Sequence, residues 1–205
     1  MKYKEINAEY LFNNLKNGDM IGFHYKPWYY IFAKVISIFT KNEGRLKIEH
    51  IGICYNVEKN CNETLFNFGE QLTATGRTNN KIIIKYFTKN YTTLKNSKTT
   101  SHLFGKNIEF YLLELKHNLT PIQNLTLNTY FNVKEKYSVK SAVASVPFFQ
   151  KIFKVKDKNK DNYCSGAVHT ALNSIGIGLD TKDTLPSPAE LSTFDYIANI
   201  YKITE

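Results

Sequence analysis

The hydrophobic pattern of the chain changes from strand-like to helix-like near residue 119 of 205. Before this point, β-branched and aromatic residues occur in short runs that are typical of strands. The predicted strands span residues 20–25, 48–55, 64–68, 81–87 and 107–116. Beyond it, the apolar spacing predicts mainly helices. We therefore expect an α+β fold with an antiparallel sheet of about five or six strands packed against helices.

Most of the predicted helices follow the strands, one precedes them, and one lies among them. Apolar spacing, early prolines and a closing glycine predict helices at residues 8–16, 28–39, 121–132, 139–153, 164–175 and 186–191. Residues 90–100 are predicted to form a polar loop or a short helix, and residues 196–203 a strand or a tail. No repeat or linker divides the chain, so we expect a single domain over residues 1–205.

The composition excludes several classes of protein. An apolar content of 42% is too high for a disordered chain. The first residues lack the apolar segment of a signal peptide, and no apolar run is long enough to cross a bilayer. We expect a cytoplasmic protein without a transmembrane segment. The three cysteines, Cys54, Cys61 and Cys164, are too irregularly spaced for a disulfide framework or a zinc module, so no metal or cofactor is expected.

The net charge of +9 indicates anionic partners, such as an anionic cell-wall polymer, lipid headgroups or nucleic acid. The lysines are dispersed, and the densest run covers residues 151–160. This run is predicted to be a solvated loop, with an anion-binding rim beside Cys164 as the alternative. No motif for RNA or DNA binding is present, which makes nucleic acid the least favoured partner.

Cys164 lies where this polar loop turns into a predicted helix. The N–H groups and the positive dipole end of a first helical turn stabilise a thiolate, so Cys164 is a candidate nucleophile. His50, near the start of a predicted buried strand, is the candidate base, because imidazole is the usual partner of a catalytic thiol. The alternative is a buried structural cysteine and a histidine bonded to the backbone. Only the tertiary fold can bring the two residues together.

Four short motifs occur in a fixed order along the chain. They are Gly18-Asp19, then Glu49-His50-Ile51-Gly52-Ile53, then Tyr163-Cys164-Ser165, and last Pro186-Ser187-Pro188. This order resembles the circularly permuted papain-like group of the NlpC superfamily, in which the histidine precedes the cysteine. The group includes the YiiX- and YaeF-type cysteine hydrolases and the lecithin retinol acyltransferase-like enzymes. The resemblance covers most of the chain and implies a permuted papain-like fold with the nucleophile at a helix N-terminus.

The resemblance also implies roles for particular residues. Cys164 would be the nucleophile, His50 the base, and Glu70, in the stretch after the base strand, would orient the imidazole. Glu49, Gln71 and Asn67 are the alternatives to Glu70. The tetrahedral oxyanion would be held by the Cys164 N–H, with the hydroxyl of Tyr163 or Tyr25 as a further donor. No catalytic role is assigned to the remaining histidines, which are His24, His102, His117 and His169.

The activity implied is hydrolysis of an amide bond through an acyl-enzyme, with peptide or peptidoglycan-type substrates. No histidine lies between His50 and His102, which favours the hydrolase branch over the acyltransferase branch. Two alternatives stay open: a lipid-directed thioesterase or acyltransferase of the same fold, and a basic non-enzymatic binding module. A wall hydrolase without a signal peptide would come from a phage or be delivered by a dedicated export machine. The sequence leaves the substrate and the oligomeric state open.

Overall fold

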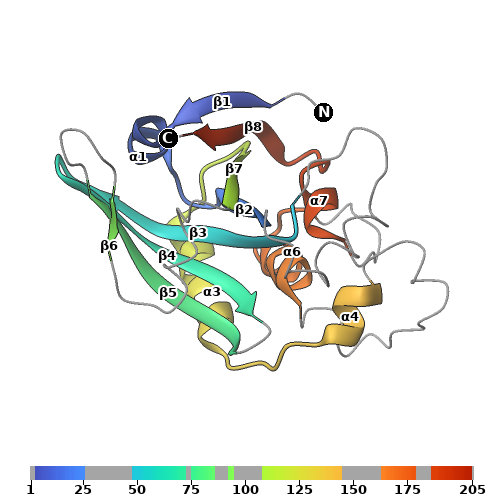
Figure 1. The fold of residues 1–205 in the computed structure, drawn as a ribbon. Coiled ribbons are helices and arrows are strands. Elements are labelled where there is room, and N and C mark those ends of the chain that lie inside the picture. The colour runs from blue at the N-terminus through green and yellow to red at the C-terminus, as the bar shows by residue number, and fades with distance from the viewer. Residues whose placement is uncertain are drawn as a thin grey trace.

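The computed structural model describes residues 3–25, 48–72, 75–85, 92–94, 108–144, 163–178 and 186–204. A single curved sheet crosses this part of the chain, with helices on both of its sides (Figure 1). The helix predicted at residues 28–39, the lysine run at 151–160 and the end of the helix predicted at 139–153 lie outside the described residues.

Within the described residues the sheet has eight strands in the order β1-β8-β7-β2-β3-β4-β5-β6. The strands are β1 Lys4–Asn7, β2 Met20–Tyr25, β3 His50–Lys59, β4 Glu63–Leu72, β5 Gly76–Lys85, β6 Thr92–Leu94, β7 Ile108–Leu115 and β8 Ile197–Thr204. Every neighbouring pair is antiparallel except β1 and β8, which are parallel. The α+β class is confirmed.

The predicted size and uniform direction of the sheet are wrong. The sheet has more than five or six strands and contains a parallel pair. The unpredicted strands β1 and β6 are the two edges of the sheet, and they are short and polar in sequence. Edge strands contribute little to the core, so they need no apolar alternation and leave little trace in the sequence. β6 lies within residues 90–100, where a loop or short helix was expected.

The described helices are α1 Ala8–Asn14, α3 Pro121–Asn132, α4 Val139–Ala144, α6 Cys164–Ser174 and α7 Pro188–Leu191. Their starts agree closely with the sequence, because proline and N-cap residues mark them locally. Thr120 and Gln123, for example, form a reciprocal capping box at the start of α3. None of the helices in the described part of the chain is long and apolar enough to cross a membrane.

The sheet separates two apolar clusters. One cluster lies between the sheet and helices α3 and α6, and includes Ile51, Ile53 and Leu172. The other lies on the opposite side with α1, and includes Leu11 and Cys54. Successive side chains of a strand point to opposite faces, so β3 contributes to both clusters. Cys54 is fully buried and Cys61 is exposed, as predicted.

The Gly18-Asp19 turn connects the start of β2 to its neighbours. Gly18 has a φ of 93°, a conformation that suits glycine. The buried Asp19 carboxylate accepts hydrogen bonds from the backbone N–H groups of Leu115 at 3.0 Å and Lys16 at 2.9 Å. Burial raises the pKa of Asp19 to about 7, against the lowering effect of these two bonds. The hydrogen bonds of this motif therefore fix the start of β2, which lies between β3 and β7 in the sheet.

Candidate active site

His50 is the first residue of β3, and the strand register places it beside β2. It pairs with Phe23, whose ring lies 5.4 Å from the imidazole between centroids. Its Nε2 atom lies 2.7 Å from Oε2 of Glu70 on β4. Ile53 pairs with Gly69 in the β3–β4 ladder, so Glu70 is a diagonal neighbour of His50 on the sheet. Glu70 is the predicted orienting residue, and the structure brings it to the imidazole.

Asn80 on β5 holds the other oxygen of Glu70. Its side-chain amide donates to Glu70 Oε1 at 3.0 Å. The Glu70 side chain is only 1% exposed, so water contributes little to its hydrogen bonding. The Asn80 amide and His50 supply the hydrogen bonds that a buried carboxylate needs. Both carboxylate oxygens are therefore engaged, which fixes the plane of the group and the direction of its bond to His50. Sequence reasoning missed Asn80, because only the β4–β5 pairing brings it to Glu70.

Cys164 is the first residue of α6, as predicted, and its side chain is buried. Its sulfur lies 3.9 Å from the carbonyl oxygen of Glu49, a long contact for a weak thiol donor. The N-cap residue Tyr163 is extended and makes no side-chain cap hydrogen bond. The first intrahelical bond runs from Ala167 N to the Tyr163 carbonyl at 2.8 Å. No N-cap side chain is folded over the N-terminus of α6.

The charge state of His50 is set by its two partners. Burial of the ring opposes protonation, but hydrogen bonding to Cys164 and Glu70, and the charges of both, outweigh it and raise the pKa of His50 to about 10. Since Glu70 takes Nε2, Nδ1 is the ring nitrogen left to interact with the sulfur. The arrangement favours a protonated imidazole between the Glu70 carboxylate and Cys164.

The other residues proposed for the site have different partners. The Glu49 side chain contacts His24, Asn67 donates to Asn128, and Gln71 donates to the Glu135 carbonyl. None of these three orients His50 among the described contacts. The Tyr163 hydroxyl, expected near the oxyanion, donates to the Pro186 carbonyl at 3.2 Å because the ring is buried beneath the start of α7. The Tyr25 backbone ends β2, and its side chain lies outside the described residues.

A second histidine–carboxylate pair lies beside the first, and the sequence did not indicate it. His24 Nδ1 is 2.8 Å and 2.9 Å from the two carboxylate oxygens of Glu49. The Glu49 side chain is 2% exposed and that of His24 is 18% exposed. Glu49 is also the residue whose carbonyl faces the sulfur of Cys164. Glu49 of this pair and His50 of the first pair are therefore consecutive residues of the chain.

His169 lies further along α6 and is buried. Its Nε2 atom is 3.2 Å from the side-chain amide of Asn173, and its ring packs on Phe194. Burial lowers the pKa of His169, which favours the neutral ring. These contacts agree with the expectation that His169 points away from Cys164.

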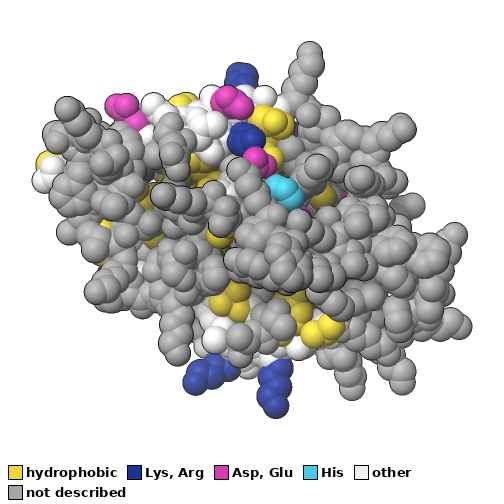
Figure 2. Space-filling view, in the orientation of Figure 1, with side chains coloured by type: hydrophobic (Ala, Val, Ile, Leu, Met, Phe, Trp, Pro, Cys, Tyr) yellow, Lys and Arg dark blue, Asp and Glu magenta, His cyan; other side chains and the backbone are white. Residues whose placement is uncertain are grey.

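The described residues hold no group of three His, Cys, Asp or Glu side chains that could bind a metal ion. Their charges form pairs on the surface, among them Lys16 with Glu114 and Lys202 with Glu109. Figure 2 shows basic and acidic side chains next to one another, and a histidine beside them, on one face. On that face the described part of the chain shows no single basic patch.

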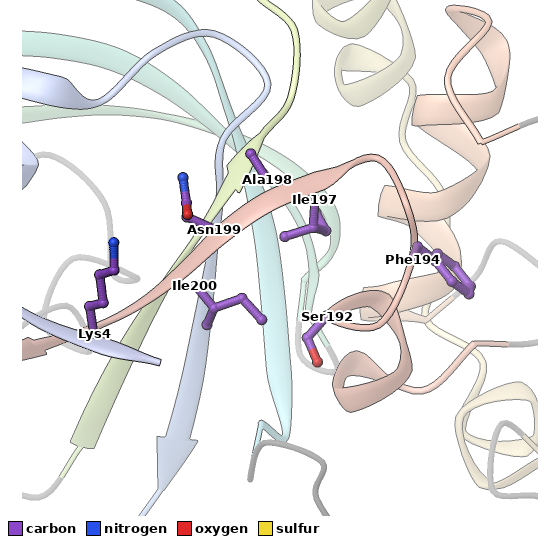
Figure 3. Close-up of a pocket in the computed structure, with 7 residues that line it drawn as sticks. All are labelled: Lys4, Ser192, Phe194, Ile197, Ala198, Asn199 and Ile200. Carbon is purple, nitrogen blue, oxygen red and sulfur yellow. The ribbon is translucent and has the colours of Figure 1, made fainter. Parts of the chain in front are cut away.

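A small hollow lies between the start of β8 and the turn after α7 (Figure 3). Its volume is about 170 Å³, and it is lined by Lys4, Ser192, Phe194, Ile197, Ala198, Asn199 and Ile200. Neither the Cys164–His50–Glu70 group nor Asn80 lines it. The chemistry of the candidate site therefore does not lie in this hollow.

Comparison with known proteins adds no relative: no protein-family model matches the chain, and no curated protein matches it.

Proposed function

We propose that the protein is a cysteine hydrolase that cleaves amide bonds, with Cys164 as nucleophile, His50 as acid and base, and Glu70 as the residue that orients His50. The observation that carries the proposal is the contact chain from Asn80 through Glu70 to His50 and Cys164. A buried carboxylate, an imidazole and a cysteine at a helix start supply the orienting group, the base and the nucleophile of a thiol triad. The order of the motifs supports assignment to the permuted papain-like group.

The reaction follows from the protonation state of the pair. The Cys164 thiolate attacks the acyl carbon, a C–S bond forms, and the carbonyl electrons move to oxygen. The first-turn N–H groups of α6, which the Tyr163 side chain does not cap, stabilise that oxyanion. When the C–N bond breaks, protonated His50 gives its proton to the leaving amine. Neutral His50 then takes a proton from water, and the hydroxide releases the acid and restores the thiolate.

Amide substrates of peptide or peptidoglycan type fit the hydrolase branch and the net charge of +9, which favours an anionic polymer. The test uses muropeptide and synthetic peptide amides beside matched esters of the same acyl group. We expect amide cleavage, and a covalent acyl adduct on Cys164 detected by mass spectrometry. Cleavage of the esters alone would shift the assignment to a lipid-directed thioesterase or acyltransferase.

Two cysteine variants control this experiment. Cys164→Ala should abolish both cleavage and adduct. Cys61→Ala, which removes an exposed thiol far from the site in the fold, should leave both unchanged. Full cleavage by Cys164→Ala would reject Cys164 as the nucleophile, whereas a wild-type protein that cleaves neither amides nor esters would leave a binding module as the alternative.

A further inference from the structure

The residues on both sides of Cys164 are bonded to one backbone carbonyl. Pro186 O accepts a hydrogen bond from the Ser165 hydroxyl at 2.7 Å and one from the Tyr163 hydroxyl at 3.2 Å. All three residues are buried, and Tyr163 and Ser165 are at most 1% exposed. Pro186 lies directly before the capping residue of α7, so the bonds join the start of α6 to the start of α7.

The N-terminus of α6 differs from the other helix starts for which the structure describes a cap. Asn7, Thr120 and Ser187 cap α1, α3 and α7 with their side chains, whereas Tyr163 makes no such bond. A capping side chain would accept bonds from first-turn N–H groups. In α6 these groups are needed for an oxyanion, so an ordinary cap would compete with the reaction. The start of α6 needs another means of being held in place.

The support for this carbonyl is itself rigid. Ser187 and Glu190 form a reciprocal capping box at α7, with bonds of 2.7 Å and 3.3 Å. Leu191 of α7 is fully buried in the cluster that also contains Ala167 and Val168 of α6. The Pro186 carbonyl therefore lies on a well-packed element, and a hydroxyl bonded to it cannot move far.

We propose that Ser165 is a positioning residue, which together with Tyr163 anchors the first turn of α6 to Pro186 and thereby sets the position of the Cys164 sulfur relative to His50. Among the described residues, the anchoring takes the place of a side-chain cap from Tyr163 on the first-turn N–H groups. This inference rests on the proposed function for its biological meaning. The dependence of Cys164 reactivity on the Ser165 hydroxyl can be measured without any substrate.

The chain offers a matched control for the loss of a buried serine bond. Ser192 is also 0% exposed, and its hydroxyl donates to the Ala189 carbonyl at 2.6 Å within α7. Ser165→Ala and Ser192→Ala thus remove the same group from equally buried sites. Only Ser165 is adjacent to the nucleophile. Tyr163→Phe is a second test variant that removes the longer of the two anchoring bonds and keeps the ring.

The experiment measures alkylation of Cys164 by iodoacetamide as a function of pH, located by mass spectrometry, together with the melting temperature. We expect Ser165→Ala to slow alkylation at neutral pH about tenfold and to move the rate profile to higher pH, because the sulfur moves away from His50. Tyr163→Phe should give a smaller change in the same direction. Ser192→Ala should keep the wild-type profile at a comparable loss of melting temperature.

Steady-state kinetics on an amide that the wild-type protein cleaves separates the positioning role of Ser165 from the proposed hydrolase function. For Ser165→Ala we expect kcat to fall about tenfold with KM within about twofold, since the substrate site itself is intact. A wild-type alkylation profile in folded Ser165→Ala, or an equal shift in Ser192→Ala, would overturn the positioning role. Failure of the wild-type protein to cleave any amide or ester, with the alkylation contrast intact, would instead reject the proposed function alone.

Discussion

The described part of the chain contains two histidine–carboxylate pairs near the start of β3, and the pairs differ in the group that lies on the other side of the imidazole ring. His50 and Glu70 are 2.7 Å apart, and His24 and Glu49 are 2.8 Å apart. Both carboxylates are almost fully buried, and both rings are partly exposed. In the described part of the chain, the imidazole of the first pair interacts with Cys164, which helps to raise the pKa of His50, whereas the second pair meets this cysteine only through the backbone carbonyl of Glu49. A histidine–carboxylate pair alone therefore does not identify a candidate active site. The cysteine next to the imidazole distinguishes the His50 pair from the His24 pair.

The two pairs diverge because consecutive side chains of an extended chain point to opposite sides. Glu49 and His50 are neighbours in sequence, yet Glu49 meets His24 and His50 meets Glu70. The same alternation separates His24 from Phe23, whose ring packs on His50. Each pair therefore belongs to its own face of the sheet, and each can be removed while the other is left in place.

The largest expected effect is on turnover when each histidine is removed. His50→Ala should lower kcat/KM for an amide substrate about 10³-fold, because the acid and base is lost. His24→Ala should change it by no more than about threefold, since His24 contacts Glu49 and not the sulfur. Steady-state kinetics on both variants checks this. Equal losses would mean that the two pairs act together, contrary to the proposed roles.

Replacing the two carboxylates should change kcat by factors that differ less than those expected for the two histidines. Glu70→Gln keeps the shape but removes the charge that stabilises protonated His50, and kcat should fall about 10²-fold. Glu49→Gln should leave kcat nearly unchanged and lower the free energy of unfolding by about 2 kcal/mol, because a buried charged hydrogen bond is weakened. Urea unfolding and kinetics on both variants test the contrast. A larger loss of kcat in Glu49→Gln would reverse the assignment.

A smaller loss of kcat is expected when Asn80 is replaced, because Asn80 acts on His50 only by holding Glu70. Asn80→Ala removes the amide that holds Glu70 Oε1 and should lower kcat about tenfold with little change in KM. Asn79→Ala is the matched control, because its side chain points to the other face and donates to Asn128 and Asn132. If the two alanine variants behave alike, Asn80 has only a structural role.

The last prediction concerns protonation of His50, measured by NMR titration of the ring protons. The pKa of His50 is about 10, above its ordinary 6.5, so protonation favours the folded state. The stability that this provides is complete below pH 6.5 and is lost as the pH rises through about 10. Cys164→Ala should lower the pKa of His50, because a hydrogen-bond partner and a negative charge are removed. An unchanged titration would show that Cys164 does not interact with the ring.

Much of the local structure could be predicted from the sequence. The strands that contain His24 and His50 and the helix that begins at Cys164 carry strong apolar patterns or start signals. The strand predicted over residues 64–68 stopped short of Glu70, which lies in β4. The edge strands β1 and β6 could not be predicted, because edges bury little and need no such pattern. The sequence also did not indicate that the Tyr163 hydroxyl bonds to Pro186 or that Glu49 contacts His24, since a side chain's partner depends on which element packs against it.

The sequence by itself determined that Cys164 starts a helix, that His50 lies near the start of a buried strand, and that both occur in an α+β chain. These properties depend on residues a few positions away, and local periodicity and capping report them. Only the tertiary structure decided that His50 pairs with Glu70, that Glu49 pairs with His24, and that Ser165 is tied to Pro186. These contacts join residues distant in sequence, and strand order, register and helix packing select them.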